Sequence, residues 1–130
     1  MTTSLIDQYF EDHKKYQKKY GSKVVILQQI GSFFETQSVD NDEEKIGDVP
    51  AIAELLNIQA TRKNKSIAEN SRSNPMLCGF PLASLTRCLG VLVGAGYTCV
   101  VIEQTTPPPN PKREITQIAS PGTYTEINET

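Results

Sequence analysis

Residues 31–35, Gly-Ser-Phe-Phe-Glu, place two aromatic rings and a carboxylate directly after a β-branched run. The run, Val24–Ile30, predicts a strand, the glycine a tight turn or bulge, and the residues after it a second extended segment. In an extended chain alternate side chains share a face, so Phe33 and Glu35 point one way and Phe34 the other. If Phe34 enters the core, the exposed pair suits a ligand with a flat face and polar edges, such as a nucleobase.

The chemistry open to this pair is stacking combined with hydrogen bonding. A Phe33 wedge inserted at a base step costs roughly a few kcal/mol of unstacking, least where pairing is already faulty, and stacking returns about 1–3 kcal/mol. An ionised Glu35 only accepts, so it pairs with an N–H of a thymine or guanine edge, whereas a purine ring nitrogen requires its protonated form. The carboxylate also repels phosphate, which disfavours paired DNA that does not admit the wedge. The alternative is that Phe33 is a core aromatic and Glu35 an ordinary strand-edge charge.

Length and composition limit the class of protein. The 130 residues, 38% of them hydrophobic, suffice for one domain with a single core. No apolar run approaches the ~20 residues of a membrane span, and the N-terminus lacks a signal-peptide pattern. We therefore expect a soluble, intracellular protein that has no membrane partner. The sequence does not distinguish cytoplasm or nucleoid, organelle and viral factory. Cys78, Cys88 and Cys99 lack CxxC spacing, which predicts buried thiols and no metal site.

Charge argues for weak DNA binding by the isolated chain. The net charge is −2 and the isoelectric point about 5.4, whereas proteins that hold DNA by electrostatics alone tend to be basic. One basic group lies in the first helix and a second, with Arg72, in residues 61–65. A solvated surface is the usual explanation for such groups. Beside an aromatic reader, however, we expect phosphate contacts that set the register, from Arg62, Lys63 and Lys65.

The hydrophobic pattern predicts an α/β fold in which a mixed β-sheet is flanked by helices, in a single compact domain. A capping pattern at Ser4 opens a helix that ends at Gly21, and Asp48 with Pro50 opens a second in which Ile52, Leu55 and Leu56 are expected to be buried. The other expected elements are an acidic loop over 39–48, a polar loop over 57–73, a strand over 76–80, a helix over 82–93, a buried strand over 97–104, a proline loop over 105–111 and an edge strand over 113–120.

Four segments together carry a family resemblance. Residues 31–35, 75–81 (Pro-Met-Leu-Cys-Gly-Phe-Pro), 95–104 and 118–123 resemble, in the same order, landmarks of the N-terminal domain of MutS-type DNA mismatch repair proteins. The similarity runs from about residue 5 to residue 124. Departures from the family pattern are Ile30 for a common methionine, Ser32 for aspartate, Phe34 for tyrosine, and Leu82-Ala83 for tyrosine-histidine, so this could be a divergent branch.

The resemblance implies that Phe33 stacks on a mispaired base and that Glu35 bonds its edge. It implies double-stranded DNA with mismatches or small loops as the partner, and a longer parent protein that is dimeric through other domains. Residues 1–124 would then be the mismatch-recognition domain and 125–130 the start of a connector. A non-reading interaction or structural domain of a MutS homologue is the alternative.

Enzymatic activity is not expected of this chain. The ATPase of the family needs a P-loop, and no such segment occurs here, so ATP and Mg would bind elsewhere in the parent protein and no cofactor is expected in this domain. His13 lies on an apolar helix stripe and is expected to be a packing residue. The remote alternative is a metal-dependent nuclease built on the acidic residues 40–44 with Lys45, but a polar loop holds carboxylates poorly for Mg²⁺.

Overall fold

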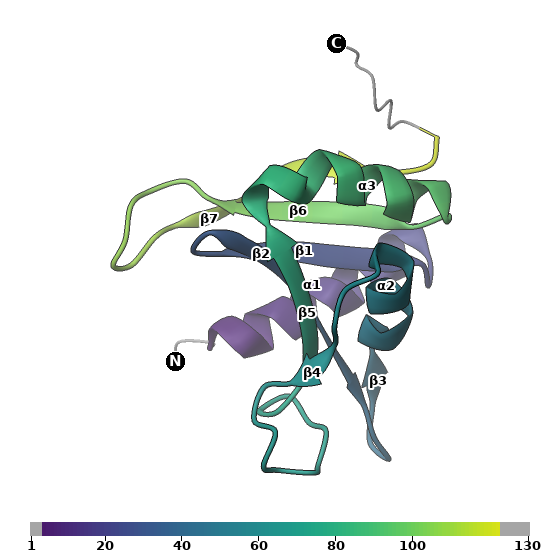
Figure 1. The fold of residues 1–130 in the computed structure, drawn as a ribbon, viewed down its shortest axis with the longest axis vertical. Coiled ribbons are helices and arrows are strands. Elements are labelled where there is room, and N and C mark those ends of the chain that lie inside the picture. The colour runs from purple at the N-terminus through teal and green to yellow at the C-terminus, as the bar shows by residue number, and fades with distance from the viewer. Residues whose placement is uncertain (1–3, 123–130) are drawn as a thin grey trace.

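The computed structural model describes residues 4–122, which form a mixed sheet of seven strands with helices on both faces (Figure 1). The strand order is β4-β5-β2-β1-β6-β7, with β3 paired to β2; β1 and β6 run parallel and the other pairs antiparallel. This confirms the expected α/β fold, while the expected boundary between residues 124 and 125 lies outside the described residues. The elements are α1 (Leu5–Tyr20), β1 (Val24–Ile30), β2 (Phe33–Asp40), β3 (Lys45–Ile46), α2 (Val49–Leu56), β4 (Thr61–Arg62), β5 (Met76–Pro81), the 3₁₀ helix η1 (Leu82–Ser84), α3 (Leu85–Gly94), β6 (Thr98–Gln104) and β7 (Arg113–Ala119).

The two faces of the sheet bury separate apolar clusters, because side chains alternate along each strand. Helix α1 covers one face, where Phe10 packs with Val24, Ile26 and Val100. Helices α2 and α3 cover the other face. Strands β1 and β6 lie at the centre and are buried on both faces over their first five residues.

Helix α1 begins and ends where the sequence predicts. The Ser4 side chain accepts a hydrogen bond from the Asp7 amide at 3.2 Å, which satisfies one of the free N–H groups of the first turn. Gly21 follows the last residue with φ of 99°, a conformation that glycine adopts without strain. The caps fix both ends of α1, and its apolar stripe packs against the sheet.

The Tyr9 hydroxyl of α1 reaches between β1 and β2. It accepts from the Gln37 amide at 2.7 Å and lies 3.2 Å from the Ile26 carbonyl and 3.0 Å from Thr36 Oγ1. The Ile26 carbonyl belongs to β1 and the Gln37 amide to β2. The paired residues of these two strands are Gln28–Glu35, Gln29–Phe34 and Ile30–Phe33, so Ile26 and Gln37 lie beyond the last pair. Burial raises the pKa of Tyr9, so the phenol stays protonated and takes the place of a ladder hydrogen bond.

Three details of the predicted elements are wrong. Residues 57–73 are not a loop throughout, because the short strand β4 lies within them and pairs with β5. Leu55 is 41% exposed, because in a helix of only eight residues the buried stripe falls on Ile52, Ala53 and Leu56 instead. The acidic stretch 39–48 is not a loop throughout, because β2 continues to Asp40 and β3 pairs back onto it.

Replacing Tyr9 with phenylalanine tests the hydroxyl bridge. Tyr9→Phe leaves the part-buried Gln37 amide without its partner, so we expect the free energy of unfolding to fall by about 1–3 kcal/mol. Tyr20→Phe, at an exposed tyrosine of the same helix, is the control and should change little. Urea denaturation of the 130-residue chain measures both, and an equal effect of the two variants would contradict the bridge.

Candidate nucleic-acid interface

The β1–β2 hairpin turns in two residues and presents Phe33 immediately after the turn. Ile30 and Phe33 face each other across the hairpin, and Gly31 and Ser32 connect them. Gly31 has φ of 61°, in the left-handed region that a two-residue hairpin turn requires and that glycine favours. Phe33 therefore lies at the tip of a hairpin whose two strands, β1 and β2, are at the centre of the sheet.

The orientations expected along β2 are correct. Phe34 is 2% exposed and packs on Phe80, with ring centroids 5.9 Å apart, in the cluster under α2 and α3. Phe33, on the opposite face, is 48% exposed, and Glu35 on the same face is half-buried. An exposed ring and a partly desolvated carboxylate thus lie two residues apart on one face.

Gly79 of β5 makes room for the Glu35 side chain. It lies directly opposite Glu35 in the β2–β5 ladder. A Cβ atom at Gly79 would lie 3.2 Å from Glu35 Cγ and 2.7 Å from the Phe34 carbonyl oxygen, the second closer than real Cβ contacts come. The Glu35 side chain therefore passes over a strand position without a side chain.

The ionisation of Glu35 is set mainly by burial, which one cation opposes. Burial raises the pKa of the Glu35 carboxyl, and the Lys63 ammonium lowers it. Tyr9 and Cys78 also lie within electrostatic range, but burial raises the pKa of both, that of Cys78 to about 12, so both are neutral near pH 7. Gln28, opposite Glu35 on β1, carries no charge.

The three basic residues expected at this site have different environments. Lys63 is exposed and, through its electrostatic effect on Glu35, belongs with the hairpin face. Arg62 is turned inward: its guanidinium donates to the carbonyls of Ile67 at 2.8 Å and of Lys65 at 2.9 Å. Lys65 is exposed on the same loop. Lys63 thus acts electrostatically on Glu35, while Arg62 shapes the loop that carries the two lysines.

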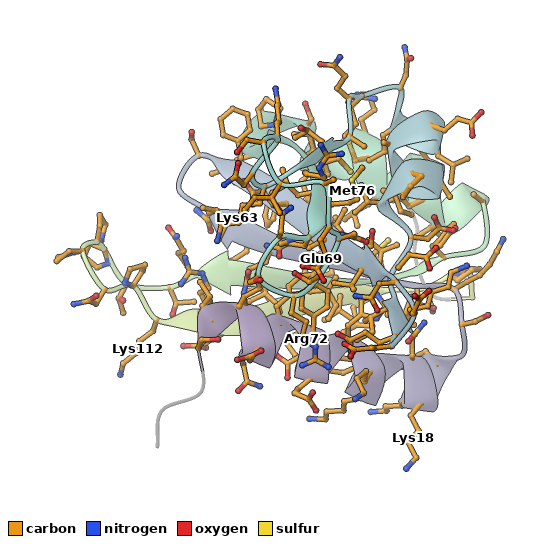
Figure 2. All side chains as sticks on the ribbon, turned by 90° about the horizontal axis from the view of Figure 1, so that it is seen from below. Lys18, Lys63, Glu69, Arg72, Met76 and Lys112 are labelled. Atoms are coloured by element: carbon orange, nitrogen blue, oxygen red, sulfur yellow. The ribbon has the colours of Figure 1, made fainter. Side chains whose placement is uncertain are left out.

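Arg72, the remaining cation of this region, anchors the loop to α1 (Figure 2). Its guanidinium makes two 3.0 Å hydrogen bonds to the Glu44 carboxylate and one of 3.2 Å to Glu11. It also lies over the Phe10 ring, 5.8 Å from the centroid. Glu44 is thereby committed to an ion pair, which weakens the nuclease alternative; within residues 4–122, no three His, Cys, Asp or Glu side chains are placed to hold a metal.

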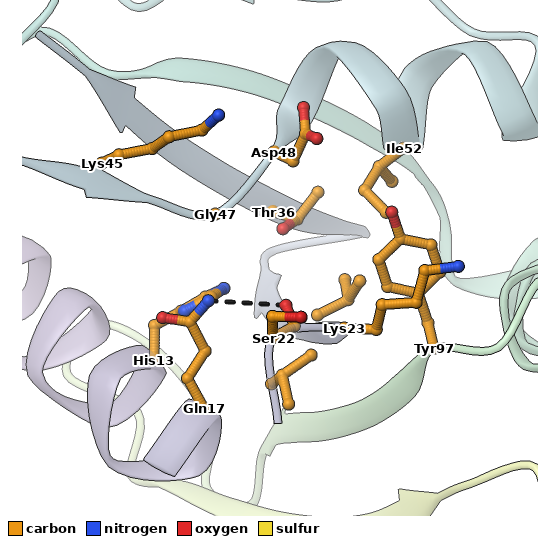
Figure 3. A pocket seen from close by; sticks show the side chains of 12 residues that line it. His13, Gln17, Ser22, Lys23, Thr36, Lys45, Gly47, Asp48, Ile52 and Tyr97 are labelled. Atoms are coloured by element: carbon orange, nitrogen blue, oxygen red, sulfur yellow. Dashed lines mark hydrogen bonds between the residues drawn. The ribbon is translucent and has the colours of Figure 1, made fainter. Parts of the chain in front are cut away.

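A cavity beside His13 lies at another part of the fold (Figure 3). It has a volume of about 390 Å³ and is lined by residues of α1, the starts of β1 and α2, and Tyr97. His13 is buried, and burial lowers its pKa, so the imidazole is neutral near pH 7. The hydrogen bond drawn there joins the Gln17 amide to the Ser22 carbonyl at 3.5 Å. His13 is a packing residue, as the sequence predicts.

Sequence reasoning missed three residues around the hairpin turn, Gln29, Gln104 and Arg113. Hydrogen bonds link them around Gly31, although they lie on β1, β6 and β7. The sequence carries a partial signal for Gln29 alone, because this polar residue interrupts the apolar pattern of a central strand. Among the described helices, none is both long and apolar enough to span a membrane.

Comparison with known proteins gives a consistent result. Residues 3–128 match the family described as MutS domain I. A DNA mismatch repair MutS homologue of Acanthamoeba polyphaga mimivirus is 32% identical over 117 residues, covering 89% of this chain and 10% of that protein. The DNA mismatch repair protein MutS of Bartonella quintana is 29% identical (95% of this chain, 13% of that protein), and the mitochondrial mutS homologue of Sarcophyton glaucum 30% (88% and 13%). The chain thus spans about a tenth of the length of these relatives.

The close approach at Gly79 predicts a specific intolerance. Gly79→Ala forces β2 and β5 apart, so we expect a loss of about 1–3 kcal/mol in the free energy of unfolding. Gly94→Ala is the control, because an added Cβ there meets nothing within 4 Å and alanine favours the helix. Denaturation curves of both variants decide the matter: equal stabilities would show that Gly79 is not needed for packing.

Proposed function

The chain belongs to the MutS domain I family, and from that premise we propose that it is the mismatch-reading module of a longer DNA mismatch repair protein. One observation carries the proposal: the exposed Phe33 ring stands beside the half-buried Glu35 on one face of the hairpin. The names of the relatives, which describe DNA mismatch repair proteins, agree with it. A DNA substrate also implies a location inside the cell.

Phe33 acts as the wedge in this proposal. Its ring inserts at a base step and stacks on the mispaired base, at an unstacking cost that is least where pairing is already faulty. The wedge needs no base-specific contact, so one residue can detect many mispairs. The buried neighbour Phe34 supports it, because the core holds β2 in place while the ring is pushed into the duplex.

Glu35 supplies the polar contact to the base edge. Burial raises its pKa, so the protonated form that can donate to a purine ring nitrogen is more accessible than for an exposed glutamate. Lys63 is the expected phosphate contact nearest this pair, and Lys65 a further one on the loop. Arg62 remains a candidate phosphate contact only through donors that its two carbonyl bonds leave free.

The other activities of mismatch repair are assigned to other parts of the parent protein. We propose that ATP hydrolysis with its Mg²⁺, and dimerisation, reside in the segments that this chain does not span. This module then binds DNA without a cofactor and without catalysing a step. Its acidic net charge fits a role that supplies discrimination while other parts of the parent supply affinity.

A non-reading interaction domain is the second candidate. The edge strand β7 exposes Ile115 and Ile118 by 43% and 37%, which is apolar surface that a neighbouring domain could cover. Mismatch binding separates the two candidates, because an interaction domain has no need of Phe33.

Phe33→Ala in the parent protein tests the wedge. We expect its affinity for a G·T-mismatched duplex to fall about 5–150-fold, the equivalent of 1–3 kcal/mol of lost stacking, while matched-duplex affinity barely changes. Leu82→Ala, at another exposed apolar residue nearby in the fold, is the control and should keep the preference. Binding is measured at one stated salt concentration. A wild type without mismatch preference, or a Phe33→Ala variant that retains it, would favour the interaction domain.

The pH dependence of mismatch binding tests Glu35 and Lys63 together. Lys63 favours the ionised carboxylate, so Lys63→Met in the parent protein should raise the pKa of Glu35 and move the midpoint of the pH profile to higher pH. Lys65→Met, which removes a lysine of the same loop, should leave the midpoint in place. Glu35→Gln should abolish it. An unchanged midpoint in Lys63→Met would show that Lys63 does not act on Glu35.

A further inference from the structure

We propose that Gln29, Gln104 and Arg113 are positioning residues that hold the hairpin turn and thereby aim Phe33. The inference rests on the proposed function, since it concerns how the wedge is mounted. It arises from hydrogen bonds that link three strands around the turn: Gln29 and Gln104 bond the backbone of Gly31, and Arg113 bonds the Gln29 carbonyl and Gln104.

Gln29 links the turn to β6. Its side-chain amide nitrogen donates to the Gly31 carbonyl at 2.9 Å. Its side-chain oxygen accepts from the backbone amide of Gln104 at 2.8 Å, across 75 positions of sequence. One glutamine side chain thus uses both of its polar ends to tie the first residue of the turn to the last residue of a central strand.

Gln104 and Arg113 complete the attachment from the edge of the sheet. They pair directly in the β6–β7 ladder, and Arg113 Nε donates to the Gln29 backbone carbonyl at 3.1 Å. With the Gln104 amide turned so that its oxygen meets both donors, that oxygen accepts from Arg113 Nη2 at 3.0 Å and from the Gly31 amide at 3.2 Å. Both backbone polar groups of Gly31 are then held by glutamine side chains.

The opposite side of the turn is held as well. The Ser32 carbonyl accepts from the Leu82 amide at 3.1 Å, where β5 passes into η1. The turn is therefore fastened on two sides, although both of its residues are exposed. Phe33 is the next residue along the chain, so movement of the turn would move the Phe33 ring as well.

Such a mount matters because a wedge must resist the stack that it enters. A mobile turn would lose conformational entropy on insertion, and that loss would reduce the difference between mismatched and matched DNA. A turn held in advance does not pay this cost at the moment of binding. The network should therefore raise discrimination more than it raises general DNA affinity.

Charge distinguishes this role from a simple phosphate contact. Arg113 alone could bind a phosphate, and its loss would then weaken matched and mismatched binding alike and lower the salt dependence by about one phosphate contact. Gln29 and Gln104 are neutral. Their loss cannot act through counterion release, so they report on positioning alone.

The test compares Gln29→Met, Gln104→Met and Arg113→Met in the parent protein, using a G·T-mismatched duplex and its matched twin over a series of salt concentrations. Methionine keeps the length of glutamine without its hydrogen bonds. We expect each variant to lower the ratio of mismatched to matched affinity about 3–30-fold, as for the loss of one or two hydrogen bonds. The glutamine variants should keep matched-duplex affinity and its salt slope. The double variant of the two glutamines should lose less than the product of the single losses, because both act on one turn.

Gln117→Met, at an exposed glutamine of β7, is the matched control and should behave as wild type. Hydrogen exchange of residues 29–33 in the parent protein without DNA gives a readout independent of binding, and the Gln29 and Gln104 variants should exchange faster there while the rest of the sheet does not. Unchanged exchange, retained discrimination in both glutamine variants, or an equal loss on both duplexes would overturn the proposal. If the wild type itself does not discriminate, the proposed function fails, and exchange alone then decides whether the network holds the turn.

Discussion

The burial of Phe34 is the constraint on which the arrangement of the site depends. Phe34 lies in the core under α2 and α3, and alternation along β2 then places its neighbours Phe33 and Glu35 on the opposite face. A slip of one residue would bury Glu35 in that core and expose Phe34, which the loss of apolar contacts and the desolvation of a carboxylate both oppose. The register of the sheet therefore protects the orientation of the exposed pair.

The sheet also gathers what the hairpin needs from distant parts of the chain. Gly79 of β5 leaves space for Glu35, the loop that follows β4 brings Lys63 within electrostatic range, and the ends of β6 and β7 support the turn. Arg72 fastens that loop to α1 and to the carboxylate of Glu44. Contacts within the folded chain therefore position the exposed Phe33 and the half-buried Glu35.

Local signals in the sequence predict a large part of this structure. The apolar run before Gly31, the capping pattern at Ser4 and the proline near the start of α2 each describe contacts within a few residues, so the helices, the strand pair and the orientation of Phe33 could be predicted. Leu55 shows the limit, because in so short a helix the spacing alone does not choose between neighbouring faces. The hydrogen bonds of Arg62 and Arg72 could not be predicted either. They depend on which acceptors the loop brings near, and a basic residue in a polar loop carries no sign of its partner.

The support of the hairpin is the part most distant from sequence reasoning. Gln29, Gln104 and Arg113 meet only because β1 pairs in parallel with β6 and β6 pairs with β7.

The central claim, that the exposed ring at the hairpin tip touches the mispaired base, is tested most directly by photo-crosslinking. We would incorporate p-benzoylphenylalanine in place of Phe33 in the parent protein and map its crosslinks on DNA. The account predicts crosslinks at the mismatched base pair and few on a matched duplex. Crosslinks of equal yield on both duplexes, or none to DNA at all, would contradict it.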